Sequence, residues 1–154
     1  MQTNNPTRRD AVLAAMALPV VLATAASASA AEMTAVEKSN LQTALEFIKL
    51  WGDPAATGAK LAAYLADDCV VITEESKPAA RGRAAAEEMF SGYMARGRID
   101  MAVEGTYAFG PVVLIGKRDA FIRDGKPGKA NPFAGLFIMR DGKIKEWTEY
   151  AAKV

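Results

Sequence analysis

The sequence predicts an α+β domain in which three N-terminal helices pack on a strongly curved sheet. The sheet is mixed, mostly antiparallel, and shaped like a cone that encloses a pocket. Two observations carry this prediction. Apolar residues recur at helical spacing in three segments before residue 95, and from Ile99 onward they alternate with a period of two. Helices that precede a run of strands favour an α+β architecture, and a sheet curved over helices leaves an open, pocket-forming mouth.

The helices have recognisable ends. Thr34 and Glu37 form a capping box before the first helix, and Gly52 is its expected stop. Thr57 is the expected cap of a short second helix, which Asp67-Asp68 would end. The third helix is predicted by an apolar stripe made of Ala86, Met89, Phe90, Tyr93 and Met94.

The strands follow from β-branched runs and turn residues. Cys69–Thr73 predicts a strand, and residues 77–82 predict a loop. Gly105 interrupts the next strand and indicates a bulge, and Asp141-Gly142 predicts a two-residue hairpin turn. We expect the four antiparallel strands at residues 99–109, 112–123, 133–140 and 144–151, with a hairpin loop at 124–128.

Composition excludes several classes of chemistry. The chain has no histidine and one cysteine, Cys69, which excludes a Ser-His-Asp triad, a His-ligated zinc site and an intrachain disulfide. It carries 19 basic and 18 acidic residues, and removing Arg8, Arg9 and Asp10 leaves 17 of each. Such a balance gives no electrostatic reason to expect nucleic acid or an acidic membrane as a partner. We therefore expect no metal site, and chemistry that depends on carboxylates, Lys, Arg, Tyr and bound water.

Residues 1–30 have the pattern of a signal peptide. A polar segment with Arg8-Arg9 precedes an apolar, Ala-rich run, and overlapping Ala-x-Ala sites follow at residues 26–31. Pro19 interrupts the run, which is too short to span a membrane. The paired arginines resemble a twin-arginine signal, while Ala11 leaves a general secretory signal open. We expect export to the periplasm or beyond, and one mature domain over residues 31–154 with no stable membrane insertion after cleavage.

Charged residues fall at positions that strand alternation places inside. Trp147 and Glu149 share one face of the last strand, so Glu149 points inward if Trp147 does. A lone buried carboxylate costs several kcal/mol, roughly, and needs a partner. Lys117 or Asp119 on a neighbouring strand could supply it.

Several motifs together resemble limonene-1,2-epoxide hydrolase, a family of the nuclear transport factor 2-like superfamily that also holds ketosteroid isomerases and polyketide cyclases. The similarity extends over about residues 38 to 152, in the same order of elements. Its motifs are Gly82-Arg83, Lys117-x-Asp119, Ala134-Gly-Leu-Phe137 with Asp141-Gly-Lys-Ile144, and Trp147-Thr-Glu149-Tyr150.

The resemblance implies a division of catalytic roles. Glu149 takes the position of the base that activates a water, and Asp119 that of the acid that protonates the epoxide oxygen. Lys117 takes the position of an arginine that bridges the two carboxylates, although lysine lacks the bidentate fork. The family needs no cofactor, and a homodimer through the sheet is implied.

The resemblance also suggests a substrate-binding surface for a small apolar molecule. Trp147 would form a wall, while Val71 and Thr73 stand where the family positions its water with Tyr and Asn. Three further aromatic residues are expected in the core or the pocket wall, namely Phe121, Phe137 and Tyr107.

Three functions remain open on the residues alone. The first is a hydrolase that opens an epoxide of a small apolar molecule with water. The second is an isomerase or cyclase in which Asp119 or Glu149 moves a proton beside a carbonyl. The third is a non-catalytic ligand-binding module, in which the charged residues form a salt-bridge cluster that only stabilises the sheet.

Overall fold

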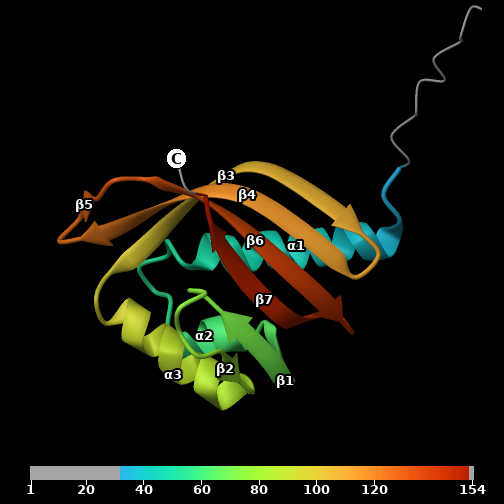
Figure 1. Ribbon diagram of the computed structural model, residues 1–154, viewed down its shortest axis with the longest axis horizontal. Helices are drawn as coiled ribbons and strands as arrows, with labels where there is room; N and C mark the ends of the chain where they lie inside the picture. The colour runs from blue at the N-terminus through green and yellow to red at the C-terminus, as the bar shows by residue number, and fades with distance from the viewer. Residues whose placement is uncertain (1–31, 153–154) are drawn as a thin grey trace, which may run out of the picture. The chain divides into compact units, whose positions relative to one another are not determined.

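Three helices and seven strands make up residues 32–152, the part of the chain that the computed structural model describes (Figure 1). The predicted signal peptide, residues 1–30, lies outside the described residues. In chain order the elements are α1 (Ala35–Leu50), α2 (Gly58–Ala62), β1 (Leu65–Ile72), β2 (Ala80–Arg81), α3 (Arg83–Met94), β3 (Arg98–Phe109), β4 (Val112–Arg123), β5 (Lys126–Pro127), β6 (Asn131–Arg140) and β7 (Lys143–Ala151).

The helix starts are those expected from the sequence. Thr34 and Glu37 make a reciprocal capping box, and the Thr57 hydroxyl accepts the backbone N–H of Lys60 at the start of α2. Gly82 precedes α3 with φ of 84°, a conformation that glycine adopts without steric cost. Within residues 32–152, no helix is long and apolar enough to cross a membrane.

All seven strands belong to one mixed sheet with the order β2-β1-β7-β6-β4-β3, and β5 pairs with β4 off this path. Only β1 and β7 run parallel, which agrees with the mixed, mostly antiparallel sheet expected. The expected bulge is present, because the register of β3 and β4 shifts between Val103 and Gly105.

Three local predictions were wrong. Asp67 and Asp68 do not end α2 but lie within β1, which begins at Leu65. Their side chains point to solvent, where Asp68 pairs with Arg140 and Lys145, so this strand accommodates two acidic residues. The expected loop at 77–82 contains β2, and the expected hairpin loop at 124–128 contains β5.

The core lies between the helices and the concave side of the sheet (Figure 1). Helix α1 packs against β3, β4 and β7, while α3 packs against α2 and β1. Phe47 on α1 meets the Trp147 ring edge-on, with 4.9 Å between ring centres, and Trp147 stacks on Phe137 at 5.9 Å. This aromatic core fixes β7, and with it the position of Glu149.

Candidate active site

Three charged side chains meet inside the cone. The Nζ atom of Lys117 lies 2.6 Å from Oδ2 of Asp119 and 2.8 Å from Oε2 of Glu149. Lys117 and Asp119 are two residues apart on β4, so their side chains lie on the same face of the sheet. Glu149 comes from β7, which is separated from β4 by β6. The Lys117 ammonium also lies 5.2 Å from the centre of the Phe133 ring. One cation therefore holds two carboxylates from different strands.

The cluster is almost completely removed from solvent. The side chain of Lys117 is 0% exposed, that of Glu149 6% and that of Asp119 14%. Burial raises the pKa of both the Asp119 and the Glu149 carboxyls, and the nearby Lys117 ammonium opposes this rise. Two carboxylates and one ammonium carry a net charge of −1, so one added proton makes the buried cluster neutral.

The hydrogen bonds distinguish the two carboxyl groups. Glu149 accepts at both oxygens, from Lys117 Nζ at Oε2 and from Trp147 Nε1 at Oε1. Asp119 accepts from Lys117 at Oδ2, while its buried Oδ1 atom has no partner among the described residues. Two charge-stabilising donors favour the ionised form of Glu149. By hydrogen bonding, the Asp119 carboxyl, with its unpartnered Oδ1 atom, is therefore the better position for a proton added to the cluster.

A cavity of about 450 Å³ opens beside the cluster. Asp119 and Glu149 both line it. Trp51, whose buried indole N–H has no partner within residues 32–152, forms part of the wall. A ligand oxygen in the cavity could accept from that N–H group. The remaining lining residues include both apolar or aromatic and polar side chains: Ile99, Met101, Phe121, Phe133, Trp147, Thr73, Glu74, Tyr93, Gly128, Lys129 and Asn131.

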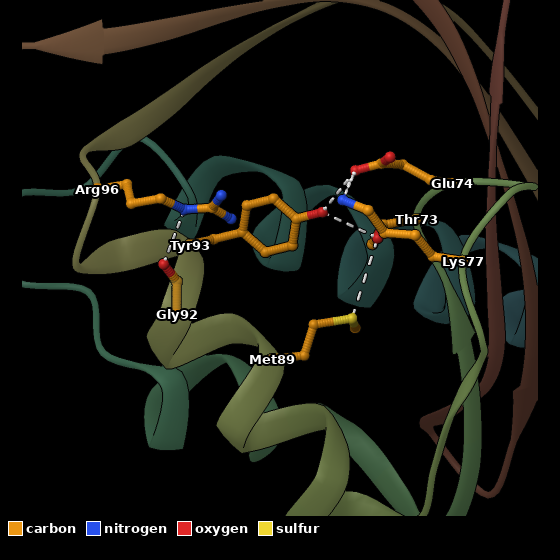
Figure 2. Close-up of polar contacts among 7 residues, drawn as sticks. All are labelled: Thr73, Glu74, Lys77, Met89, Gly92, Tyr93 and Arg96. Atoms are coloured by element: carbon orange, nitrogen blue, oxygen red, sulfur yellow. Dashed lines mark hydrogen bonds and ion pairs between the residues drawn. The ribbon is translucent and has the colours of Figure 1, made fainter.

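A second polar group on the cavity wall joins Thr73, directly after β1, to Tyr93 on α3 (Figure 2). The Tyr93 hydroxyl on α3 lies 3.1 Å from the Thr73 hydroxyl and donates to Oε1 of Glu74 at 3.3 Å. Lys77 pairs with the same Glu74 oxygen, and the Arg96 guanidinium covers the Tyr93 ring. The phenol is therefore held in place from both sides.

The structure separates the predicted substrate-binding residues into two groups. Trp147, Thr73 and Phe121 line the cavity. Val71 and Phe137 do not line it: both are buried in the core, where the Phe137 ring stacks on that of Trp147.

Tyr107 is not part of the pocket wall at all. It is 59% exposed and pairs with Leu114, itself 41% exposed, on the outer face of the sheet. A strand with apolar residues on both faces gives no sign of which face is inside.

Sequence reasoning missed several lining residues. Tyr93 lies on an apolar helix stripe and resembles a core residue, and Trp51 lies at the end of α1 among other apolar side chains. Glu74 also lines the cavity, whereas its neighbour Glu75 is exposed and does not line it. The signal available in the sequence was Tyr93 itself, one helical turn after Met89. A buried phenol hydroxyl needs a hydrogen-bond partner, so a tyrosine on an apolar stripe can indicate a polar site.

Similarity to known proteins is found in the fold and not in the sequence comparisons. No protein-family model matches the sequence, and no relative is found among curated proteins. An LEH-like epoxide hydrolase from M. tuberculosis superposes with a TM-score of 0.65 at 20% identity, over 75% of this chain and 84% of that protein.

Two further solved structures show the same architecture. An NTF2-like protein from Anabaena variabilis gives a TM-score of 0.63 at 23% identity, over 79% of this chain and 96% of that one. A protein with a ketosteroid isomerase-like fold from Catenulispora acidiphila gives 0.63 at 18% identity, over 72% and 85%. The chain therefore has the cone-shaped fold of the nuclear transport factor 2-like proteins. Proteins with this fold carry out more than one kind of reaction, so the function has to be inferred from the residues of the site.

Proposed function

We propose that this chain is a cofactor-free epoxide hydrolase that acts on a small apolar substrate. The single observation that carries the proposal is the buried Asp119–Lys117–Glu149 cluster, with a free Asp119 oxygen, at the wall of a largely apolar cavity. A proton donor and a proton acceptor in one dry pocket are what one-step opening of an epoxide by water needs. The resemblance to limonene-1,2-epoxide hydrolase supports the same assignment of roles.

The step balances on these residues. Glu149 acts in its ionised form, which accepts from Lys117 Nζ, and takes one proton from a water whose oxygen attacks an epoxide carbon. The bond from that carbon to the epoxide oxygen breaks, and Asp119 gives its proton to this oxygen, which yields a diol. Lys117 contacts both carboxyl groups and can reset them after the reaction. Its ammonium gives one proton to Asp119, and its Nζ atom takes the proton that Glu149 has gained.

The proposal is tested by incubating the full chain with a panel of small apolar epoxides in oxygen-18 water, beside the variants Asp119→Asn and Glu149→Gln. The expected result is a diol with one oxygen-18 label from the unaltered protein and at least 100-fold less, roughly, from either variant. Exposed Asp141 supplies a matched control, because Asp141→Asn should leave turnover unchanged. Equal turnover by Asp119→Asn would contradict the assignment of the acid.

A proton-moving isomerase is the second candidate, because the Tyr93 phenol lines the same cavity as the carboxylates. An isomerase of this type needs one carboxylate and a neutral hydrogen-bond donor to a carbonyl oxygen. Deuterium exchange beside the carbonyl of an enone, without diol formation in the epoxide panel, would favour it. If neither reaction occurs but apolar ligands bind equally to the unaltered protein and Asp119→Asn, the chain is a binding module.

We also propose that the chain forms a homodimer through the outer face of its sheet. Apolar side chains are exposed there, with Tyr107 59%, Phe109 67% and Leu114 41% accessible. Sedimentation should show a dimer that Phe109→Glu converts to a monomer, while Val36→Glu, on the exposed side of α1, leaves it intact. A monomeric unaltered protein would contradict this arrangement.

Export is the last part of the proposal, since residues 1–30 have the pattern of a signal peptide. We expect the protein recovered outside the cytoplasm to begin near Ala31. Replacing Arg8 and Arg9 by lysine should block export if the twin-arginine route is used. An uncleaved chain that stays in the cytoplasm would contradict export.

A further inference from the structure

On the cavity wall, the hydroxyls of Thr73 and Tyr93 and the carboxylate of Glu74 form a chain of polar contacts (Figure 2). Tyr93 has one hydroxyl proton, and it is donated to Oε1 of Glu74 at 3.3 Å. Glu74 is held next to the Lys77 ammonium and can accept this proton but, when ionised, has none to give. The Tyr93 oxygen can therefore only accept from the Thr73 hydroxyl, which lies 3.1 Å away.

The direction of this chain fixes what Thr73 offers to the cavity. Its single proton goes to the Tyr93 oxygen, and the alternative partner, the sulfur of Met89 at 3.9 Å, is a weak acceptor on the same helix. In either case the proton points toward α3. The lone pairs of the Thr73 oxygen remain, so Thr73 acts as an acceptor toward a molecule in the cavity.

Thr73 directly follows β1, whose parallel pairing with β7 ends with Val71 opposite Trp147 and Ile72 opposite Thr148. Continued by one residue, this register would place Thr73 opposite the proposed base, Glu149. Both residues line the cavity, and adjacent strands are about 4.8 Å apart. A water between them can donate one proton to Glu149 and the other to Thr73, because both offer lone pairs. Its own lone pairs are then free to face the substrate.

We propose that Glu74 and Tyr93 are positioning residues, which orient the Thr73 hydroxyl so that the attacking water is held as a donor to Thr73 and Glu149. This inference rests on the proposed hydrolase function. It identifies the mouth residue Glu74, 44% exposed and distant in sequence from the charged cluster, as part of the machinery that aims the nucleophile. A misdirected Thr73 proton would turn that water around and aim a hydrogen at the epoxide carbon.

The test is a set of variants that remove single links of the chain. Thr73→Val deletes the acceptor with almost no change of shape, and we expect kcat to fall roughly 10- to 100-fold while KM and Tm stay close to their original values. Thr73→Ser retains the hydroxyl and should restore most of kcat. Tyr93→Phe and Glu74→Leu should each lower kcat several-fold, and the double variant should be no worse than Tyr93→Phe alone, since the two act through one chain.

Glu75→Leu is the matched control, because Glu75 is an exposed neighbour that does not line the cavity. It should change neither kcat nor KM. Full kcat in Thr73→Val, or additive losses in the double variant, would overturn the inference.

A neutron structure of the deuterated full chain gives a readout independent of turnover. We expect deuterium on Tyr93 directed at Glu74, deuterium on Thr73 directed at α3, and a water bridging Thr73 and Glu149. That water should be lost in Thr73→Val. If this arrangement is found but no epoxide is opened, the hydrolase proposal fails and the hydroxyl chain stands. If diol forms but deuterium on Thr73 points into the cavity, the hydroxyl chain fails and the hydrolase stands.

Discussion

Lys117 and Glu149 form a buried ion pair, with 2.8 Å between Nζ and Oε2, although their strands are not neighbours in the sheet. The strand between them, β6, places Gly135 opposite Glu149, and this residue has no side chain to obstruct the contact. The lysine side chain thus reaches across one strand to join acid and base. The electrostatics of the site depend on this single contact and its counterpart to Asp119.

Removing the cation should destabilise the fold in a pH-dependent way. In Lys117→Met two buried carboxylates lose the one ion-pair partner that the described part of the chain gives them, and we expect the free energy of unfolding at about pH 7 to fall by roughly 3 kcal/mol. The deficit should shrink as the pH falls, because protonation of Asp119 and Glu149 in the folded state removes the buried charges. Urea unfolding across a pH series measures this.

Arg118→Met is the control for that series. Arg118 is next in sequence, but it faces solvent and pairs with Glu104 on the exposed surface, with both side chains about half exposed. Its loss should cost less than about 1 kcal/mol and vary little with pH. If the loss of unfolding free energy in Lys117→Met did not change with pH, the two carboxyl groups would not be buried in their ionised form.

As the pH rises, the unaltered protein should lose stability relative to the Asp119→Asn variant. Burial raises the pKa of this carboxyl in the folded state above its unfolded value of about 3.9, so the folded state binds more protons between the two values. Its favourable contribution is fully present below the unfolded pKa and is lost as the pH rises from there through the folded pKa. Thermal unfolding of both proteins between about pH 4 and 8 tests this, and a difference that grows in favour of Asp119 with rising pH would contradict it.

Gly135 should be required for the site more than for the fold. A Cβ atom there would lie 3.0 Å from Oε1 of Glu149 and 3.0 Å from the Phe137 ring, closer than ordinary contacts. We expect Gly135→Ala to lower turnover sharply and stability by roughly 1 to 3 kcal/mol. Gly105→Ala, on β3 of the same sheet, has open space around the new methyl and should retain turnover. Equal turnover in both variants would mean that Glu149 can move without loss.

Most of the fold could be predicted from local sequence patterns, because tertiary contacts did not override them. The capping box at Thr34, the bulge before Gly105 and the change of period at Ile99 each have a physical cause within a few residues. Two of the local errors concern the short strands β2 and β5, and the third concerns β1, where Asp68 is accommodated by Lys145 on β7 and Arg140 at the end of β6. Such pairing joins residues far apart in the sequence, and no local pattern reveals it.

The site was accessible to sequence reasoning only in part. Alternation placed Glu149 beside Trp147 on one face and required a partner, which Lys117 supplies. The side of β4 that faces inward, and the cavity wall formed by Tyr93 and Trp51, depend on how the sheet curves over α1 and α3. Tyr107 was misplaced for the same reason, because exposed and buried aromatic residues look alike along a strand.

The division of labour between Asp119 and Glu149 is the central claim, and carbon-13 NMR titration of labelled carboxyl groups tests it most directly. The account predicts that both titrate above the ordinary range of about 4, and that Glu149 ionises first while Asp119 keeps the shared proton. Labelled Asp119→Asn and Glu149→Gln proteins assign the two signals. Titration of both groups at ordinary values, or ionisation of Asp119 before Glu149, would contradict the account.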